Sequence, residues 1–467
     1  MKRALNSYEE YILCGRSLTI GFIIFTYLGT WVGGGTIIGL AGMSYEEGAR
    51  SYWLFAIPTI VCYIFAFLFI TRIRKLKLNS IGDMLSLRYP HKMELIRIPV
   101  AISLMIRNVT MIGMQFSALS YLLIYSFKID RNLAILATFV IITGYTFLSG
   151  LWGVVITDVF QGFLQTLGLV IILFLCIKLS GGFAGLNQFF SSTEQGNLLS
   201  LVGNDVKQWG KDTGVYLFSF GAFFLMGDQC DWERIFSGKT DKAVFWGYLI
   251  PLTITLMLLI SPTYIGVFQR ATNLTHIDSG FIIYRFLLSN LGPVLAGFLI
   301  MTLFSAIMSS ADSYMFATGV IFSNDIIKRF INKEAEDKEL IFWTRIAVML
   351  SGAVGFAFAI NIGDPIYLWI TGLSVPVMVI LPAYIYAWFS KRVNTQGAIA
   401  GIIFGGIFAF KFLILDEKIL LSSIMYVMIG NFAVTYIVSL FYPKSSKAVE
   451  ETFYKSSKFD NVSNIPK

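Results

Sequence analysis

The chain has 467 residues, of which 56% are hydrophobic and only 14% charged, and its mean hydropathy is +0.71. A soluble domain carries about 25% charged residues, so this composition excludes an ordinary soluble protein and predicts a surface that faces lipid. The formal net charge is +8, but the basic residues lie between apolar segments, which argues against nucleic-acid binding. Both histidines, His91 and His276, fall in polar connections, and with no nucleophile–base constellation the chain is not expected to be an enzyme.

The chain contains twelve apolar segments long enough to cross a bilayer, since a spanning helix needs about 20 mostly apolar residues. They are residues 18–43, 51–72, 94–126, 132–149, 153–179, 214–232, 244–268, 291–327, 340–361, 364–390, 396–415 and 419–442. The predicted fold class is therefore an all-α polytopic membrane protein with about twelve transmembrane helices.

The basic residues of the connections predict the orientation. Lys and Arg gather in alternate connections, with both termini on the same side as most of them. Cytoplasmic loops carry such an excess, so we expect an inner (plasma) membrane protein whose N- and C-termini are cytoplasmic. The first residues lack the features of a signal peptide.

The count of segments predicts two related halves. Each half has five spans, an odd number, so the second half must be inserted with the opposite orientation, as in an inverted repeat. The expected organisation follows the chain in six parts. These are a cytoplasmic N-terminus 1–17, a first repeat 18–179, an extracytoplasmic loop 180–213, a second inverted repeat 214–390, two further helices 391–442, and a cytoplasmic tail 443–467.

The first segment is interrupted by glycines at positions 29, 33, 34 and 35. Each glycine costs about 1 kcal/mol relative to alanine inside a helix. In lipid, such a break is tolerated only where the freed backbone groups line a cavity or bind something. Freed carbonyls suit sodium, and half-helix ends supply dipoles for a substrate. The alternative is close packing of small residues against a neighbouring helix.

Charged residues in later segments add candidates. Arg107 pairs with an acid, binds a substrate carboxylate or extends to an interface. Asp158, in the fifth segment, is either a waypoint for an exiting cation or an interfacial cap. In the sixth segment, Asp228 and Gln229 either attract a cationic or zwitterionic solute or form part of an inner gate with Arg234.

The eighth segment carries adjacent hydroxyls at Ser309 and Ser310, one turn after Ala306. Two hydroxyls and the Ala306 carbonyl could coordinate a small cation, although serines in spans often bond back to their own helix. Asp312 is an acid in an apolar run, which is a functional-site hypothesis by default; a structural bond to backbone amides is the alternative.

Several motifs in order resemble the sodium:solute symporter family over residues 8–443. They are Tyr-Ile-Leu-Cys-Gly-Arg-Ser at 11–17, Gly-Leu-Ala-Gly at 39–42, Thr-Asp-Val-Phe-Gln at 157–161, Gln-Cys-Asp-Trp-Glu-Arg at 229–234 leading to Ser-Gly-Lys at 237–239, and the serine-rich stretch 305–313. The family includes proline, sugar, pantothenate, sialic acid and choline transporters. The Thr-Trp-Val-Gly-Gly-Gly form at 30–35 is similar to its choline-transporter branch.

The resemblance implies a five-plus-five inverted-repeat fold of the leucine-transporter type, with discontinuous helices 1 and 6 and alternating access. It also implies a sodium site, with Asp158 relaying the released ion. The implied sodium ligands are the carbonyls of Gly29, Val32 and Ala306 and the hydroxyls of Ser309 and Ser310. Family members normally have an additional helix before the first motif. Only about ten residues precede that motif here, so we expect either an upstream start or a shortened member.

The resemblance also suggests substrate-binding candidates, which are Trp31, Gly33, Gly34, Asp228 and Gln229. Trp31 either holds a quaternary ammonium through a cation–π contact of roughly 0.5–2 kcal/mol or packs beneath the site. Residues 225–228 lack the aromatic side chains of the choline branch, which weakens that assignment.

The predicted function is secondary active transport that couples sodium to the uptake of a small polar organic solute, such as an amine, amino acid, carboxylate or sugar. Two alternatives remain open at this point. One is proton coupling through Asp158 or Asp312, and the other is a sensor that binds its solute without transporting it. No oligomeric state is predicted.

Overall fold

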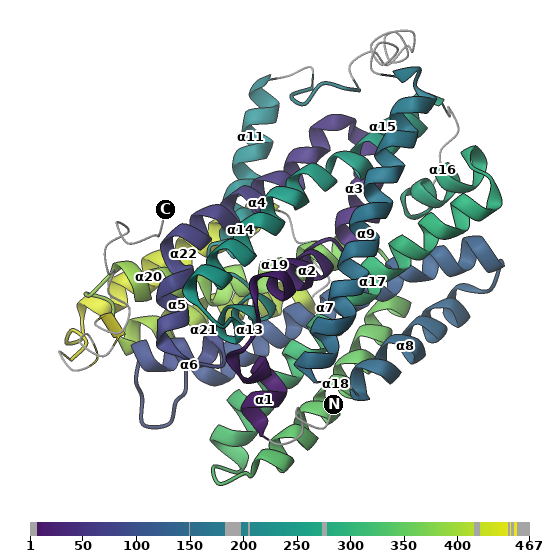
Figure 1. Cartoon of the computed structure of the whole chain (residues 1–467). Helices are drawn as coiled ribbons and strands as arrows, with labels where there is room; N and C mark the ends of the chain where they lie inside the picture. Colours follow the sequence, from purple (N-terminus) through teal and green to yellow (C-terminus); the bar gives the residue numbers. More distant parts are fainter. Residues whose placement is uncertain are drawn as a thin grey trace.

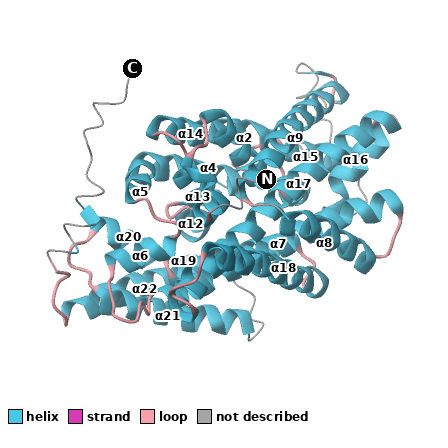
Figure 2. Ribbon diagram, turned by 60° about the horizontal axis from the view of Figure 1, so that its bottom comes forward, coloured by secondary structure: helices cyan, strands magenta, loops and turns pink. Residues whose placement is uncertain are grey.

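The computed structural model describes residues 7–148, 150–182, 198–203, 206–272, 278–414, 421–446, 449 and 453–454. Residues 183–197 and 204–205, half of the predicted extracytoplasmic loop 180–213, and parts of the predicted termini 1–17 and 443–467 lie outside the described residues. Within the described residues the elements are all helical and no strand is present (Figure 2). This agrees with the predicted all-α class.

The helices are labelled in chain order in Figure 1. Their bounds are α1 Tyr8–Leu13, α2 Ile20–Trp31, α3 Leu40–Glu47, α4 Tyr52–Phe65, α5 Thr71–Leu76, α6 Ile81–Arg88, α7 Arg97–Phe127, α8 Arg131–Leu148, α9 Leu151–Leu179, α11 Val206–Tyr216, α12 Ala222–Phe224, α13 Gln229–Ser237, α14 Asp241–Leu258, α15 Ile260–Thr272, α16 Ile282–Asn290, α17 Pro293–Ile321, α18 Asp337–Asn361, α19 Pro365–Val379, α20 Leu381–Phe389, α21 Thr395–Ile414 and α22 Leu421–Leu440.

In the described part of the chain, nine helical segments are long and apolar enough to cross a membrane, and two bent pairs raise the number to as many as eleven. The bent pairs are α2 with residues 35–47, and α19 with α20. The remaining predicted segment, 214–232, is divided between α11, a π-helical turn at Leu217–Gly221, α12 and α13. The first helix is interrupted around Gly33–Gly35, and the sixth between α12 and α13, where Gly227 has a φ of 68°.

The bend between α19 and α20 was not predicted. Residues 364–390 were expected to form one span, but the axis turns by 48° near Ile380. Pro376 and Pro382 flank the turn. Proline removes a backbone donor and clashes with the preceding turn, which accounts for the kink.

The first broken helix lies at the centre of the molecule. α2 packs against α9, α14 and α17, while α7 packs against α17, α18 and α19. Figure 1 shows α2, α7 and α17 in the middle, α8 and α18 on one side, and α20 to α22 on the other. Large apolar side chains such as Phe127, Phe160 and Val294 are 69%, 68% and 86% exposed. A bilayer would cover such side chains, in keeping with the predicted lipid-facing surface.

Candidate functional site

The break after α2 is held by side chains of neighbouring segments. Val32 follows the last α-helical residue with φ −96° and ψ 72°, and the axis turns by 54°. The amide of Gly34 donates to Gln115 Oε1 of α7 over 2.7 Å, and the Thr36 hydroxyl donates to the carbonyl of Trp31 over 2.9 Å. Backbone groups freed at membrane depth require such partners, so the break is a fixed part of the fold.

Two glycines of the break lie against neighbouring helices with no room for a side chain. A Cβ on Gly33 would overlap the hydroxyl of Ser310, and one on Gly34 would lie 2.6 Å from the Cβ of Ala118. Close packing and helix interruption therefore occur together here. The packing brings the freed carbonyls of α2 within reach of α17.

A compact group of oxygens joins α2 to α17. The Ser309 hydroxyl donates to the Gly29 carbonyl over 2.7 Å and to the Ala306 carbonyl over 3.1 Å. The Ser310 hydroxyl lies 2.9 Å from the carbonyl of Thr30 and 3.2 Å from those of Gly29 and Ala306. Both serines are fully buried. The contact from Ser309 to the other helix is shorter than its contact within α17, so back-bonding alone does not explain its orientation.

Four of the five predicted sodium ligands thus meet, namely Gly29, Ala306, Ser309 and Ser310. The fifth, Val32, is buried at the break itself. The Thr30 carbonyl was not predicted and joins the group through Ser310. All these donors are hard, uncharged oxygens, a set that suits sodium and would not suit a softer ion.

Asp158 lies beside this group and forms a buried ion pair with Arg234. A Cβ on Gly29 would be 3.3 Å from Asp158 Oδ1. Arg234 Nη2 is 3.1 Å from Asp158 Oδ2, and the Thr26 hydroxyl donates to the same oxygen over 2.5 Å. Asp158 Oδ1 has no hydrogen-bond partner among the described residues. Asp158 is thus a buried carboxylate next to the oxygen group and not an interfacial cap.

Arg234 ties α13 to several other helices. Its Nη2 also donates to the hydroxyls of Thr30, over 2.6 Å, and Ser313, over 2.9 Å. An inner gate of Arg234 with Asp228 and Gln229 was one of the two alternatives open from the sequence, and in the structure Arg234 forms its ion pair with Asp158. Both residues of the ion pair contact the Thr26 hydroxyl, which lies on α2 between Gly29 of the oxygen group and Leu18, the residue that pairs with Gly238.

Asp312 is fully buried on the same helix as the two serines. Its Oδ2 accepts from the Tyr145 hydroxyl over 2.9 Å, and its Oδ1 has no hydrogen-bond partner in the described part of the chain. The predicted alternatives were an ion role and a structural bond to backbone amides. The observed partner is a tyrosine side chain of α8.

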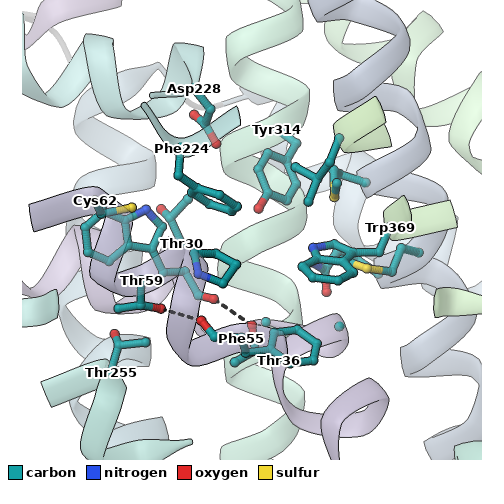
Figure 3. A pocket seen from close by; sticks show the side chains of 18 of the residues that line it. Thr30, Thr36, Phe55, Thr59, Cys62, Phe224, Asp228, Thr255, Tyr314 and Trp369 are labelled. Carbon is teal, nitrogen blue, oxygen red and sulfur yellow. Dashed lines mark hydrogen bonds between the residues drawn. The ribbon is translucent and has the colours of Figure 1, made fainter. Parts of the chain in front are cut away.

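A cavity of about 80 Å³ adjoins the break (Figure 3). Trp31 and Gly33 line it from the break, and Phe55 and Trp369 stack against each other with centroids 4.7 Å apart. Figure 3 shows Asp228 at one end of the cavity and Phe55 at the other, with Tyr314 and Phe224 between them. Further lining side chains are Thr36, Thr59, Cys62, Met111, Met114, Gln115 and Thr255.

Arg107 and Asp228 form an ion pair within this cavity. The distance from Arg107 Nη2 to Asp228 Oδ2 is 2.6 Å, and the residues are only 3% and 5% exposed. The guanidinium also lies 4.5 Å from the ring centroid of Tyr314. Of the three options open for Arg107, the structure therefore shows pairing with an acid.

Trp31 lines the cavity and is also fixed from behind. Its indole nitrogen donates to Asp231 Oδ1 over 3.0 Å. Its ring centroid lies 4.8 Å from that of Tyr27 and 4.9 Å from that of Tyr248. The indole therefore joins the cavity lining to an aromatic cluster with Tyr27 and Tyr248, which do not line the cavity.

The remaining substrate candidates lie in different places. Asp228 lines the cavity and caps α13, accepting from the amide of Asp231 over 3.1 Å. Gln229 instead contacts the loop before α6, where its Oε1 accepts from the amide of Ile81 and its Nε2 donates to the carbonyl of Asn79. Gly34 contacts α7 and is not among the residues that line the described cavity.

Sequence reasoning missed most of the aromatic lining. Phe55, Phe224, Tyr314 and Trp369 were not singled out, because aromatic side chains make up 16% of the chain and occur in nearly every span. No local pattern distinguishes a cavity-lining aromatic residue from one that faces lipid.

Comparison with known proteins places the chain among sodium:solute symporters. The model of the Sodium:solute symporter family matches residues 11–405. The high affinity choline transporter 1 of Homo sapiens is 27% identical over 85% of this chain and 70% of its own length, and the Drosophila melanogaster protein is 26% identical over 85% and 65%. The chain thus spans about two thirds of these relatives. The osmoregulated proline transporter OpuE of Bacillus subtilis is 24% identical over 96% of this chain and 91% of its own length.

Solved structures show the same fold. A Na+-coupled sialic acid symporter in a substrate-bound outward-open state has a TM-score of 0.78 and 18% identity, over 96% of this chain and 94% of that one. The nucleobase-cation-symport-1 family transporter Mhp1 has a TM-score of 0.59 and 13% identity, over 96% and 98%. The helices of this chain are therefore arranged as in known cation-coupled symporters.

Proposed function

Since the chain belongs to the sodium:solute symporter family, we propose that it couples the inward movement of sodium to the uptake of a small polar organic solute by alternating access. Its relatives are transporters and not enzymes. Both termini face the cytoplasm in this proposal, following the distribution of basic residues. The core consists of two inverted five-helix repeats, 18–179 and 214–390, followed by two further helices.

One observation carries the proposal, and it is the convergence of Ser309 and Ser310 on the carbonyls of the broken helix. The carbonyl oxygens of Gly29 and Ala306 and the two serine hydroxyls would bind sodium, and this would replace the hydrogen bonds among them. The Val32 carbonyl would be the fifth ligand. Because the ligands come from two helices, sodium would hold α2 against α17. Any motion that separates these helices would release the ion.

The buried Asp158–Arg234 pair acts as the cytoplasmic barrier below the sodium site in this proposal. It lies between the oxygen group and the Leu18–Gly238 end of the molecule, where α1 also packs. Opening towards the cytoplasm requires α13 to move away from α9, which separates the pair. Asp158 would then be exposed to the departing sodium ion, as expected for a residue on the exit path.

The solute occupies the cavity beside the break, which is lined by Trp31 and Gly33 from the broken helix and by Asp228 from the start of α13. Relatives are named for choline and proline transport, and the structural neighbour for sialic acid. The cavity of this chain has a volume of about 80 Å³ next to the break. The stacked pair of Phe55 and Trp369 would cover it on the other side from Asp228.

Reconstituted protein tests the proposal. Proteoliposomes are supplied with a pooled set of labelled small amines, amino acids, carboxylates and sugars, under an inward sodium gradient or an inward pH gradient in potassium. We expect accumulation of at least one class with the sodium gradient alone. Accumulation driven by the pH gradient without sodium would establish proton coupling, and sodium-dependent binding without accumulation would establish a sensor.

A further inference from the structure

Two side chains of opposite charge, Arg107 and Asp228, are the charged residues that line the central cavity in the described part of the chain. Charged groups at membrane depth are expensive and mark substrate pathways. A buried ion pair is seldom more stabilising than well-packed apolar residues of similar volume. Stability alone therefore does not account for this pair, and its position points to recognition of charge.

The geometry leaves hydrogen-bonding capacity for a ligand. A guanidinium has five donors in a planar fork. In Arg107, Nη2 contacts Asp228 and Nη1 donates to Asn108 Oδ1 over 3.0 Å, while Nε has no hydrogen-bond partner among the described residues. The Asp228 carboxylate is held in place by its contact to the amide of Asp231. Both charged groups are thus positioned before any solute arrives.

The charge balance of the cavity selects among solute classes. A simple cation near Asp228 would also face Arg107, and a simple anion near Arg107 would face Asp228, so each meets repulsion from a group of its own sign. A zwitterion can lie antiparallel to the pair and satisfy both charges. Its apolar body would then contact the aromatic walls formed by Phe55, Phe224 and Trp369.

The surroundings of Trp31 do not favour a simple quaternary ammonium. An aromatic cage holds such an ion by presenting ring faces to it. The Trp31 indole donates to Asp231 and packs on Tyr27 and Tyr248, neither of which lines the cavity. Phe224 and Tyr314 line the cavity near Asp228, but the Arg107 guanidinium already lies over the ring of Tyr314.

We infer that the solute is a zwitterion that carries a carboxylate and a separate ammonium, with the carboxylate bound by Arg107 and the ammonium facing Asp228. The inference rests on the proposed transport function and specifies its substrate class. Arg107 and Asp228 are then the residues that determine specificity.

Matched pairs of probes test the inference on the purified full chain. Glycine betaine and choline share a trimethylammonium and differ by a carboxylate, and proline and prolinamide differ in the same way. Thermal unfolding is followed for a panel of amino acids and betaines and for their uncharged-carboxyl counterparts, in sodium chloride or potassium chloride. We expect at least one zwitterion to raise Tm in sodium, while its matched cation does not. The inference is overturned if no zwitterion of the panel raises Tm, or if the cation of each pair is as effective.

Variants connect the result to the two residues. Arg107→Gln should weaken binding of the stabilising zwitterion by about tenfold or more, because a hydrogen bond to a charged group is lost. Asp228→Asn keeps the cap of α13 and should weaken it similarly. Arg131→Gln is the control and should leave the affinity unchanged, because Arg131 contacts the Ala359 carbonyl and neither residue lines the cavity. Equal affinity in Arg107→Gln and the unaltered chain would overturn the assignment.

The double variant Arg107→Gln/Asp228→Asn controls for misfolding caused by an unpaired buried charge. It also distinguishes the zwitterionic solute from the proposed sodium-coupled function. It removes both buried charges together, so neither is left unpaired. It should still gain stability from sodium alone while losing the response to the zwitterion. If the unaltered chain responds to sodium but prefers cations or neutral solutes, only the assignment of a zwitterionic solute is refuted. If the unaltered chain shows no response to sodium, the proposed sodium-coupled function is refuted.

Discussion

Replacing Ser310 by alanine removes one of the five oxygens proposed for the sodium site and little else. The hydroxyl is fully buried and lies 2.9 Å from the Thr30 carbonyl and 3.2 Å from the Gly29 carbonyl. Alanine fits the same helical position without steric conflict, so α17 should keep its geometry. The variant therefore reports on the oxygen alone.

The expected magnitude follows from the loss of one ligand to a charged ion. Hydrogen bonds to charged groups contribute about 1.5–3 kcal/mol, which corresponds to a sodium Kd raised roughly 10- to 150-fold. If sodium is present at about 100 times its Kd, it stabilises the protein by about 2.7 kcal/mol. A tenfold higher Kd reduces that stabilisation to about 1.4 kcal/mol.

The assay is thermal unfolding of the purified protein over a sodium titration, with potassium replacing sodium to hold ionic strength constant. Ser305→Ala is the matched control, because Ser305 lies on the same helix and its hydroxyl donates to the Met301 carbonyl. The control should change the sodium Kd by no more than about twofold. An unchanged sodium Kd in Ser310→Ala would remove Ser310 from the site and refute the reasoning.

Two further changes test the surroundings of the site. Gly33→Ala places a Cβ onto the Ser310 hydroxyl, so it should lower the free energy of unfolding by about 1–3 kcal/mol and weaken sodium binding in the same unfolding and titration measurements. Gly21→Ala is the control, because no atom lies within 4 Å of the new Cβ, and it should be neutral or stabilising. Asp158→Asn leaves Arg234 without its buried carboxylate and should destabilise the protein by about 3–5 kcal/mol in a denaturation series. Asp241→Asn, at an ion pair with one half-exposed partner, should cost less than about 1 kcal/mol, and equal losses in the two variants would contradict a special role for the buried pair.

Much of the fold was predictable because its signals are local. An apolar helix of about 20 residues matches the thickness of the bilayer core, so the all-helical class and nearly all the spans follow from composition and length. Glycine destabilises the interior of a helix, so the interruption at residues 29–35 was also predictable. The bend between α19 and α20 escaped prediction, although Pro376 and Pro382 offered a local signal for it.

The candidate sodium site was predicted through resemblance, and in the structure the carbonyls of Gly29 and Ala306 lie within hydrogen-bond distance of the hydroxyls of Ser309 and Ser310. Their meeting could not have been derived from the residues alone, because Ser309 and Gly29 are 280 positions apart. The short polar motifs show which groups are unusual in a membrane. They carry no information on which other span each group faces.

The sequence by itself determined which residues are costly to bury, among them Arg107, Asp158 and Asp228, since a charge inside an apolar segment is conspicuous wherever the chain places it. Only the tertiary structure decided how these charges pair. Arg107 meets Asp228 across 121 positions and Arg234 meets Asp158 across 76, in an arrangement fixed by the packing of α7, α9 and α13 around the broken helix. In that arrangement four charges that are isolated in the sequence form two buried ion pairs, because the energy of a buried charge depends on its nearest partner and not on its position in the chain.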